Sequence, residues 1–176
     1  MINDKESTTK NYVLNLDKED NIVELIWNNS ITNISFLFYN CPDITEINFS
    51  QNFTSLKITR MYRTYYGCTS LTSINISFFD TSHVTCICEL FYNCQNLKYI
   101  NMNNFNENSL YSEHIRSVFQ NVPNDVAICI NSNSTKIKPK IANKNCVIYD
   151  CSEDWLSKQK KYIDGKCYNS CSEHSL

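Results

Sequence analysis

The chain has 176 residues, 10 cysteines, 42% hydrophobic residues and a formal net charge of −2. Its only glycines are Gly67 and Gly165, which excludes Gly-rich phosphate loops. Its near-neutral charge gives a nucleic-acid partner no electrostatic support. The length suits one domain with a small appendage and is enough to bury a core. We expect asparagine, the most frequent residue, to occupy the turn positions that glycine usually fills.

The first predicted elements are two strands, Tyr12–Leu16 and Ile22–Trp27, on either side of a turn-like acidic segment. We expect them to cap the first repeat, so residues 1–27 are interpreted as an N-terminal strand cap. The first twenty residues are polar and lack the apolar run of a signal peptide. No apolar stretch is long enough for a transmembrane helix, and none is expected.

A repeat organises residues 28–130. The tetrapeptide FYNC ends at Cys41 and again at Cys94, with YYGC ending at Cys68 between them. Apolar residues recur at fixed offsets on both sides of each cysteine, and a degenerate fourth copy runs from Ile115 to Ile130. Self-similarity at this period is typical of stacked repeat proteins.

The two halves of each repeat differ in period. Upstream of each cysteine, apolar residues at i, i+3, i+4 and i+7, such as Ile34, Leu37, Phe38 and Cys41, predict short helices. Downstream, alternating β-branched residues predict a strand. The helices are expected near 32–39, 60–66, 85–92 and 112–121, and the strands near 45–49, 72–76, 98–102 and 126–130. The fold class is therefore predicted as an α/β leucine-rich-repeat-like solenoid of three to four coils, with one parallel sheet.

Residues 131–176 are interpreted as a Cys-rich C-terminal cap or tail. Residues 131–145 are polar and read as loop, and a helix is predicted from about Glu153 to Ile163. A terminal coil needs such a cap because it otherwise exposes one apolar face.

Cys129 occupies the outward position of the last repeat strand, where the earlier repeats have asparagine. An exposed cysteine there suggests a partner in the tail, and we predict a disulfide with Cys146 or Cys151. The other of these two is expected to pair with Cys167, which leaves Cys171 over. The phased Cys41, Cys68 and Cys94 complete apolar stripes and are predicted to stay reduced. Zinc binding by the tail cysteines is a weaker alternative.

The segment Thr72–Phe91 contains SINISFFDTSHVTCICELF. Its strand, its D-T-S-x-V-T turn and its phased cysteine resemble the BspA-like leucine-rich-repeat surface proteins of host-associated microbes, over roughly residues 22–130. The resemblance implies a secreted or surface-displayed protein that acts in adhesion and protein binding. It carries over no catalytic residue.

We expect no enzymatic activity, cofactor or metal site, because the three histidines are scattered and no catalytic motif is present. The predicted function is recognition or adhesion, with a protein or glycan bound on the outward face of the sheet. An intracellular scaffold or adaptor is the alternative, and the oligomeric state is left open. The predicted binding residues are Glu46, Asn48, Ser50, Ser73, Asn75, Ser77, Tyr99, Asn101 and Asn103.

Overall fold

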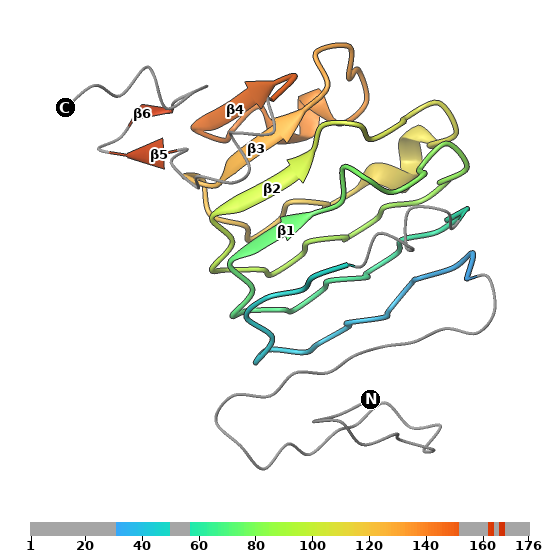
Figure 1. The fold of residues 1–176 in the computed structure, drawn as a ribbon, viewed down its shortest axis with the longest axis horizontal. Helices are drawn as coiled ribbons and strands as arrows, with labels where there is room; N and C mark the ends of the chain where they lie inside the picture. Colours follow the sequence, from blue (N-terminus) through green and yellow to red (C-terminus); the bar gives the residue numbers. More distant parts are fainter. Residues whose placement is uncertain (1–30, 50–56, 152–161, 164–165, 168–176) are drawn as a thin grey trace. The chain divides into compact units, whose positions relative to one another are not determined.

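The computed structural model describes residues 31–49 and 57–151, and the backbone of 162–163 and 166–167. The main feature is a four-stranded parallel sheet in which the strands follow one another in chain order (Figure 1). The strands are β1 (Ser73–Asn75), β2 (Tyr99–Met102), β3 (Ala127–Ile130) and β4 (Cys146–Tyr149).

Three of the four predicted strands are confirmed, and so is their parallel pairing. Ile74 pairs with Ile100, and Ile100 pairs with Ile128, so equivalent residues of successive repeats lie side by side. The strand predicted at 45–49 does not form, although the Thr72 amide donates to the Thr45 carbonyl (3.3 Å). The strand β4 lies in the tail, where the sequence analysis predicted none, so the sheet extends beyond residue 130.

The helices predicted at 32–39, 60–66 and 85–92 are wrong, because each segment is a series of four-residue turns. In the third segment, the Leu90 amide donates to the Ile87 carbonyl and the Cys94 amide to the Phe91 carbonyl, both at 3.2 Å. Such turns place their first and fourth residues on one side, as a helix does, which explains the misleading periodicity. A positive φ at Glu89 and Asn93, the third residues of these two turns, prevents a helix from continuing.

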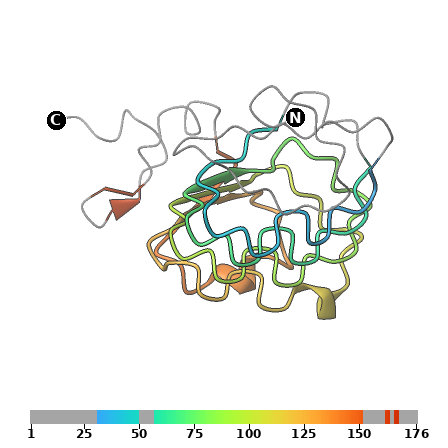
Figure 2. The same ribbon diagram turned by 90° about the horizontal axis from the view of Figure 1, so that it is seen from below.

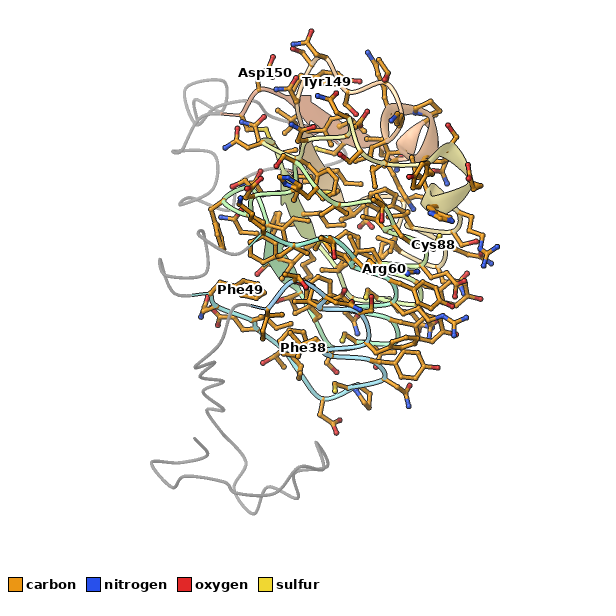
Figure 3. All side chains as sticks on the ribbon, turned by 90° about the vertical axis from the view of Figure 1, so that its right-hand side faces the viewer. Phe38, Phe49, Arg60, Cys88, Tyr149 and Asp150 are labelled. Carbon is orange, nitrogen blue, oxygen red and sulfur yellow. A yellow bond between two sulfur atoms is a disulfide. The ribbon has the colours of Figure 1, made fainter. Side chains whose placement is uncertain are left out.

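The turn segments are also hydrogen-bonded to one another. Alternate amides donate to carbonyls of the next repeat at 2.7–3.1 Å, in the way that neighbouring parallel strands do. The donors are Ile34, Phe36, Phe38 and Asn40, then Met61, Arg63, Tyr65 and Gly67, then Ile87, Glu89, Phe91 and Asn93. Segments of successive repeats consequently follow the same path (Figure 2). Figure 3 shows Cys88 of a turn segment and Phe49 on opposite sides of the described structure.

The core lies between the sheet and the turn segments. At its centre one aromatic ring from each repeat stacks on the next, with ring centroids 5.5–5.8 Å apart. The rings belong to Phe38, Tyr65, Phe91 and Phe119. Tyr65 and Phe91 are completely buried, as predicted, and Phe38 is half-buried in the first repeat.

The remaining elements are short. Two 3₁₀ helices, η2 (Ser112–Ile115) and η3 (Lys138–Ile141), follow β2 and β3, so the fourth predicted helix is reduced to one turn. A two-residue antiparallel pair, β5 (Tyr162–Ile163) and β6 (Lys166–Cys167), replaces the end of the helix predicted at 153–163. The predicted N-terminal strand pair lies outside the described residues.

The stacked rings generate the first testable prediction. Replacing Phe91 by Ala should lower the free energy of unfolding by about 3–5 kcal/mol, because it leaves a cavity between two repeats. Replacing Tyr65 by Phe should instead raise it by about 1 kcal/mol. The buried Tyr65 hydroxyl has no hydrogen-bond partner among the described residues, and its removal ends that desolvation cost. Urea denaturation measures both variants, and a destabilised Tyr65→Phe would show that the hydroxyl has a partner.

Candidate functional site

The predicted binding residues on the sheet form a ladder of side-chain amides. Asn75 Oδ1 accepts hydrogen bonds from the Ser77 amide (3.0 Å), the Ser77 hydroxyl (2.8 Å) and Asn101 Nδ2 (2.9 Å). Asn101 Oδ1 accepts from the Asn103 amide (3.0 Å), and Asn101 is only 4% exposed. These amides join neighbouring repeats to each other, so much of their hydrogen-bonding capacity is used within the chain.

The rest of the predicted face is divided. Glu46 and Asn48 are exposed, with Asn48 Nδ2 donating to Glu46 Oε1 (2.8 Å), and Ser73 and Tyr99 are half-buried. Ser50 lies outside the described residues. The sheet therefore does not present one open surface from the first repeat to the last.

At β3 and β4 the outward face of the sheet carries its own apolar cluster. It consists of Ala127, Cys129, Cys146 and Ile148, packed with Tyr99 and Cys151. Cys129 pairs in register with Asn101 and so faces outward, as predicted, but it is fully buried rather than exposed. It forms the predicted disulfide with Cys151, with the Cα atoms 6.2 Å apart.

Cys146 is also disulfide-bonded. The side chain of Cys167, its expected partner, is outside the described structure. Because Cys146 and Cys151 are both oxidised, their sulfurs are not available as thiolate ligands for the zinc site considered above.

The phased cysteines are structural. Cys41, Cys68 and Cys94 are free thiols, as predicted. The Sγ of Cys68 donates to the Phe38 carbonyl (3.1 Å) and that of Cys94 to the Tyr65 carbonyl (3.0 Å). Burial raises the pKa of Cys68 to about 12, so its sulfur stays protonated and unreactive at neutral pH.

Five aromatic residues that are exposed or half-buried gather on the turn segments. Three tyrosine rings stack in a row, with centroids 5.0 Å and 4.8 Å apart, and two further rings and an ion pair adjoin them. We call this surface the tyrosine face. It consists of Phe36, Tyr39, Tyr62, Arg63, Tyr66, Glu89 and Tyr92.

An ion pair holds the centre of the tyrosine face. Arg63 Nε donates to Glu89 Oε2 at 2.9 Å, which joins two repeats. The Arg63 guanidinium carbon also lies 4.9 Å from the Tyr62 ring centroid and 5.2 Å from that of Tyr66. Arg63 therefore packs against aromatic rings while part of its side chain stays exposed.

Backbone geometry distinguishes the tyrosine face from the turns beside it. Each repeat has two residues with positive φ. The second position holds Asn40, Gly67, Asn93 and Asn121, the residue types that tolerate this region, as expected. The first position holds Phe36, Arg63, Glu89 and Ser117, with φ between 53° and 63°.

Large side chains at positive φ cost free energy, roughly 1–2 kcal/mol each. Three of the four, Phe36, Arg63 and Glu89, belong to the tyrosine face. Strain of this kind concentrates at functional sites, where a side chain is retained for a reason other than stability.

The sequence analysis missed the tyrosine face although its signal is visible. Tyr39, Tyr66 and Tyr92 occupy the residue before the Asn or Gly of each tetrapeptide. The predicted helices were defined by their inward apolar residues, and the binding residues were predicted on the sheet. An aromatic residue repeated beside an inward one would have indicated a second, outward row.

A turn at Asp80–His83 brings a carboxylate, a hydroxyl and an imidazole together. The Ser82 hydroxyl lies 2.5 Å from Asp80 Oδ1 and 2.8 Å from His83 Nδ1. A catalytic triad needs the carboxylate on the imidazole, whereas here both groups contact the same hydroxyl. Hydrogen bonds from Ser82 lower the pKa of Asp80, and the arrangement is that of a stabilised turn.

Two charged residues lock the loops after β2 and β3 together. The Glu107 carboxylate accepts hydrogen bonds from the Ser134 hydroxyl and from the amides of Thr135 (2.9 Å), Lys136 (2.7 Å) and Ile137 (3.0 Å). In return, Lys136 Nζ donates to the carbonyls of Glu107 (2.8 Å), Asn108 (3.3 Å) and Leu110 (2.7 Å). We call this arrangement the Glu107–Lys136 clamp.

The clamp predicts a loss of stability in acid. Burial alone would raise the pKa of Glu107, but the hydrogen bonds from Ser134 and the three amides lower it below its ordinary value of 4.5. Its stabilisation is complete above that value and is lost as the pH falls through the lower, folded-state pKa.

Glu107→Gln should therefore cost about 1–2 kcal/mol at neutral pH, a value discounted because the group is half-buried. The difference from the parent should shrink in acid. Thermal melts across the acidic range measure this, and a difference that is the same at every pH would contradict it.

Comparison with known proteins places the chain. No curated protein and no solved structure matches it. Within the part of the chain that the structure describes, no helix is long and apolar enough to cross a membrane. One family model, described as "Mycoplasma protein of unknown function, DUF285", matches residues 10–129, which include the first three repeats and most of the fourth. The chain belongs to this DUF285 family.

Proposed function

We propose that the chain is a non-enzymatic recognition module that binds another protein through the tyrosine face. The observation that carries this proposal is the row of three stacked tyrosines beside an arginine, in which Tyr39 is exposed and Tyr66 and Tyr92 are half-buried. Phe36 is 48% and Tyr39 is 41% exposed. Tyrosine and arginine are enriched among the residues that dominate binding energy in protein interfaces.

The geometry of the rings favours a protein over a glycan at this surface. The Tyr66 ring is stacked between those of Tyr39 and Tyr92, so its flat surfaces are already covered. Ring edges and phenol hydroxyls remain for a ligand, and these suit the mixed apolar and hydrogen-bonding contacts of a protein partner. The pairing of Arg63 with Glu89 leaves little net charge to attract a nucleic acid.

The architecture that we propose for this module is a leucine-rich-repeat-like solenoid of the BspA-like type. Support comes from the parallel sheet, from the pairing of equivalent residues in successive repeats and from the hydrogen-bonded turn segments. A solenoid displays a repeated residue as a continuous row, which is how one tyrosine per repeat becomes an extended surface.

We place the protein outside the cell or on its surface. The Cys129–Cys151 disulfide supports this location, because disulfides persist in oxidising compartments. The alternative of an intracellular scaffold would use the same surface and would require these cysteines to be reduced. Alkylation and mass mapping of the native protein distinguish the two locations.

The proposal is tested by photocrosslinking with a photoreactive phenylalanine at position 39, in the full chain displayed to intact candidate host cells. We expect one dominant protein adduct from position 39 and none from position 149. Tyr149 is a matched control because it is equally exposed but belongs to β4.

The purified partner then provides a quantitative measurement. Tyr66→Ser and Arg63→Ala should each weaken its binding roughly tenfold or more, because central aromatic and arginine contacts dominate affinity. Tyr149→Ser should bind like the parent. Equal affinity of all variants, or an adduct from position 149 alone, would contradict the proposal.

A further inference from the structure

A hollow of about 360 Å³ lies between the loops that follow β2 and β3. Residues 104–108 line one side, and Asn131 and residues 133–136 line the other. Most of the lining side chains are amides and hydroxyls, and one is the aromatic ring of Phe105. The hollow is separate from the tyrosine face, which belongs to the turn segments.

The hollow exists because a row of phenylalanines ends. Asn75 pairs with Asn101 and Met102 pairs with Ile130, so Phe79, Phe105 and Asn133 occupy equivalent positions just beyond their strands. Phe79 and Phe105 are almost fully buried. Where a third ring would cover Phe105, the chain has an exposed asparagine, and the space over the row stays open.

The charged groups of the lining are already used. The Glu107–Lys136 clamp engages the carboxylate with four donors and the ammonium with three carbonyl oxygens. Because these bonds lie within the protein, neither charge is free to recognise an ion. They also hold the two loops at a fixed separation, which preorganises the walls of the hollow.

The amides retain free donors. Asn106 and Asn131 use Oδ1 to accept the amides of Asn108 and Asn133, both at 2.9 Å, so their Nδ2 groups make no bond within the described part of the chain. The side chains of Asn104 and Asn133 are exposed and likewise make none. A ligand here meets several neutral donors and acceptors over the almost fully buried Phe105.

We propose that this hollow is a binding subsite for a neutral saccharide. A sugar offers hydroxyls to the amides without the charge that the clamp cannot receive, and the 6% of Phe105 that is exposed gives it a small apolar contact at the floor of the hollow. Binding sites typically combine an apolar or aromatic surface with a few fixed polar groups. The inference does not depend on the tyrosine face, so either can fail alone.

The test is NMR titration of the ¹⁵N-labelled full chain with a panel of neutral mono- and disaccharides. At least one should shift the side-chain amide signals of Asn104 and Asn133 in a saturable manner, while the corresponding uronic acid binds more weakly. Asn133→Phe should abolish the shifts, because it continues the phenylalanine row and fills the hollow. Asn143→Ala, an exposed asparagine outside the lining, should titrate like the parent.

Two further readouts make the result decisive. Asn133→Phe should keep the parent's backbone spectrum and at least its stability in urea, which separates loss of binding from loss of fold. If that variant is misfolded, Asn133→Ala serves instead and should weaken binding roughly tenfold, the effect of losing a good hydrogen bond. Absence of saturable shifts with every neutral saccharide, or shifts that persist in a folded Asn133→Phe, would overturn the proposal.

Discussion

Backbone hydrogen bonding between successive repeats is the interaction on which the rest of the structure depends. Each repeat bonds to the next twice, through the parallel strands on one side and through alternate amides of the turn segments on the other. Two such ladders hold equivalent residues in register, so every side-chain type that repeats in the sequence becomes a row in space. The stacked core rings, the thiols that donate to carbonyls and the tyrosine row of the turn segments are all consequences of this register.

The repeat, its register and most of its core could be predicted, because apolar residues at fixed offsets define which positions face inward. The strands at Ser73–Asn75, Tyr99–Met102 and Ala127–Ile130 follow from that pattern. The turn segments could not be predicted from this pattern, because a series of four-residue turns and a short helix bury the same positions. Strand β4 was missed because the polar loop before it and its cysteines suggested a cap. In the structure Val147 pairs with Ile128 and continues the sheet.

The binding residues predicted on the sheet stay a prediction, and the structure adds a second surface that the sequence analysis did not consider. Asparagines on an outward sheet face resemble ligand-binding groups in a sequence, but Asn75 and Asn101 bond to each other and to their own strands' ends. The tyrosine face is marked instead by a departure from local rules. Where the fold favours Gly or Asn, the chain keeps Phe36, Arg63 and Glu89. The inter-repeat hydrogen bonds on either side offset the strain at these three residues.

Through-hydrogen-bond scalar couplings measured by NMR on the ¹⁵N,¹³C-labelled protein test the central claim most directly. The account predicts that the Phe91 amide couples to the carbonyl of Val118, and the Glu89 amide to that of Arg116, each in the following repeat. An α-helix in this segment would instead couple the Phe91 amide to the Ile87 carbonyl within its own repeat. Observation of the second pattern would contradict the turn ladder and, with it, the tyrosine face that the ladder positions.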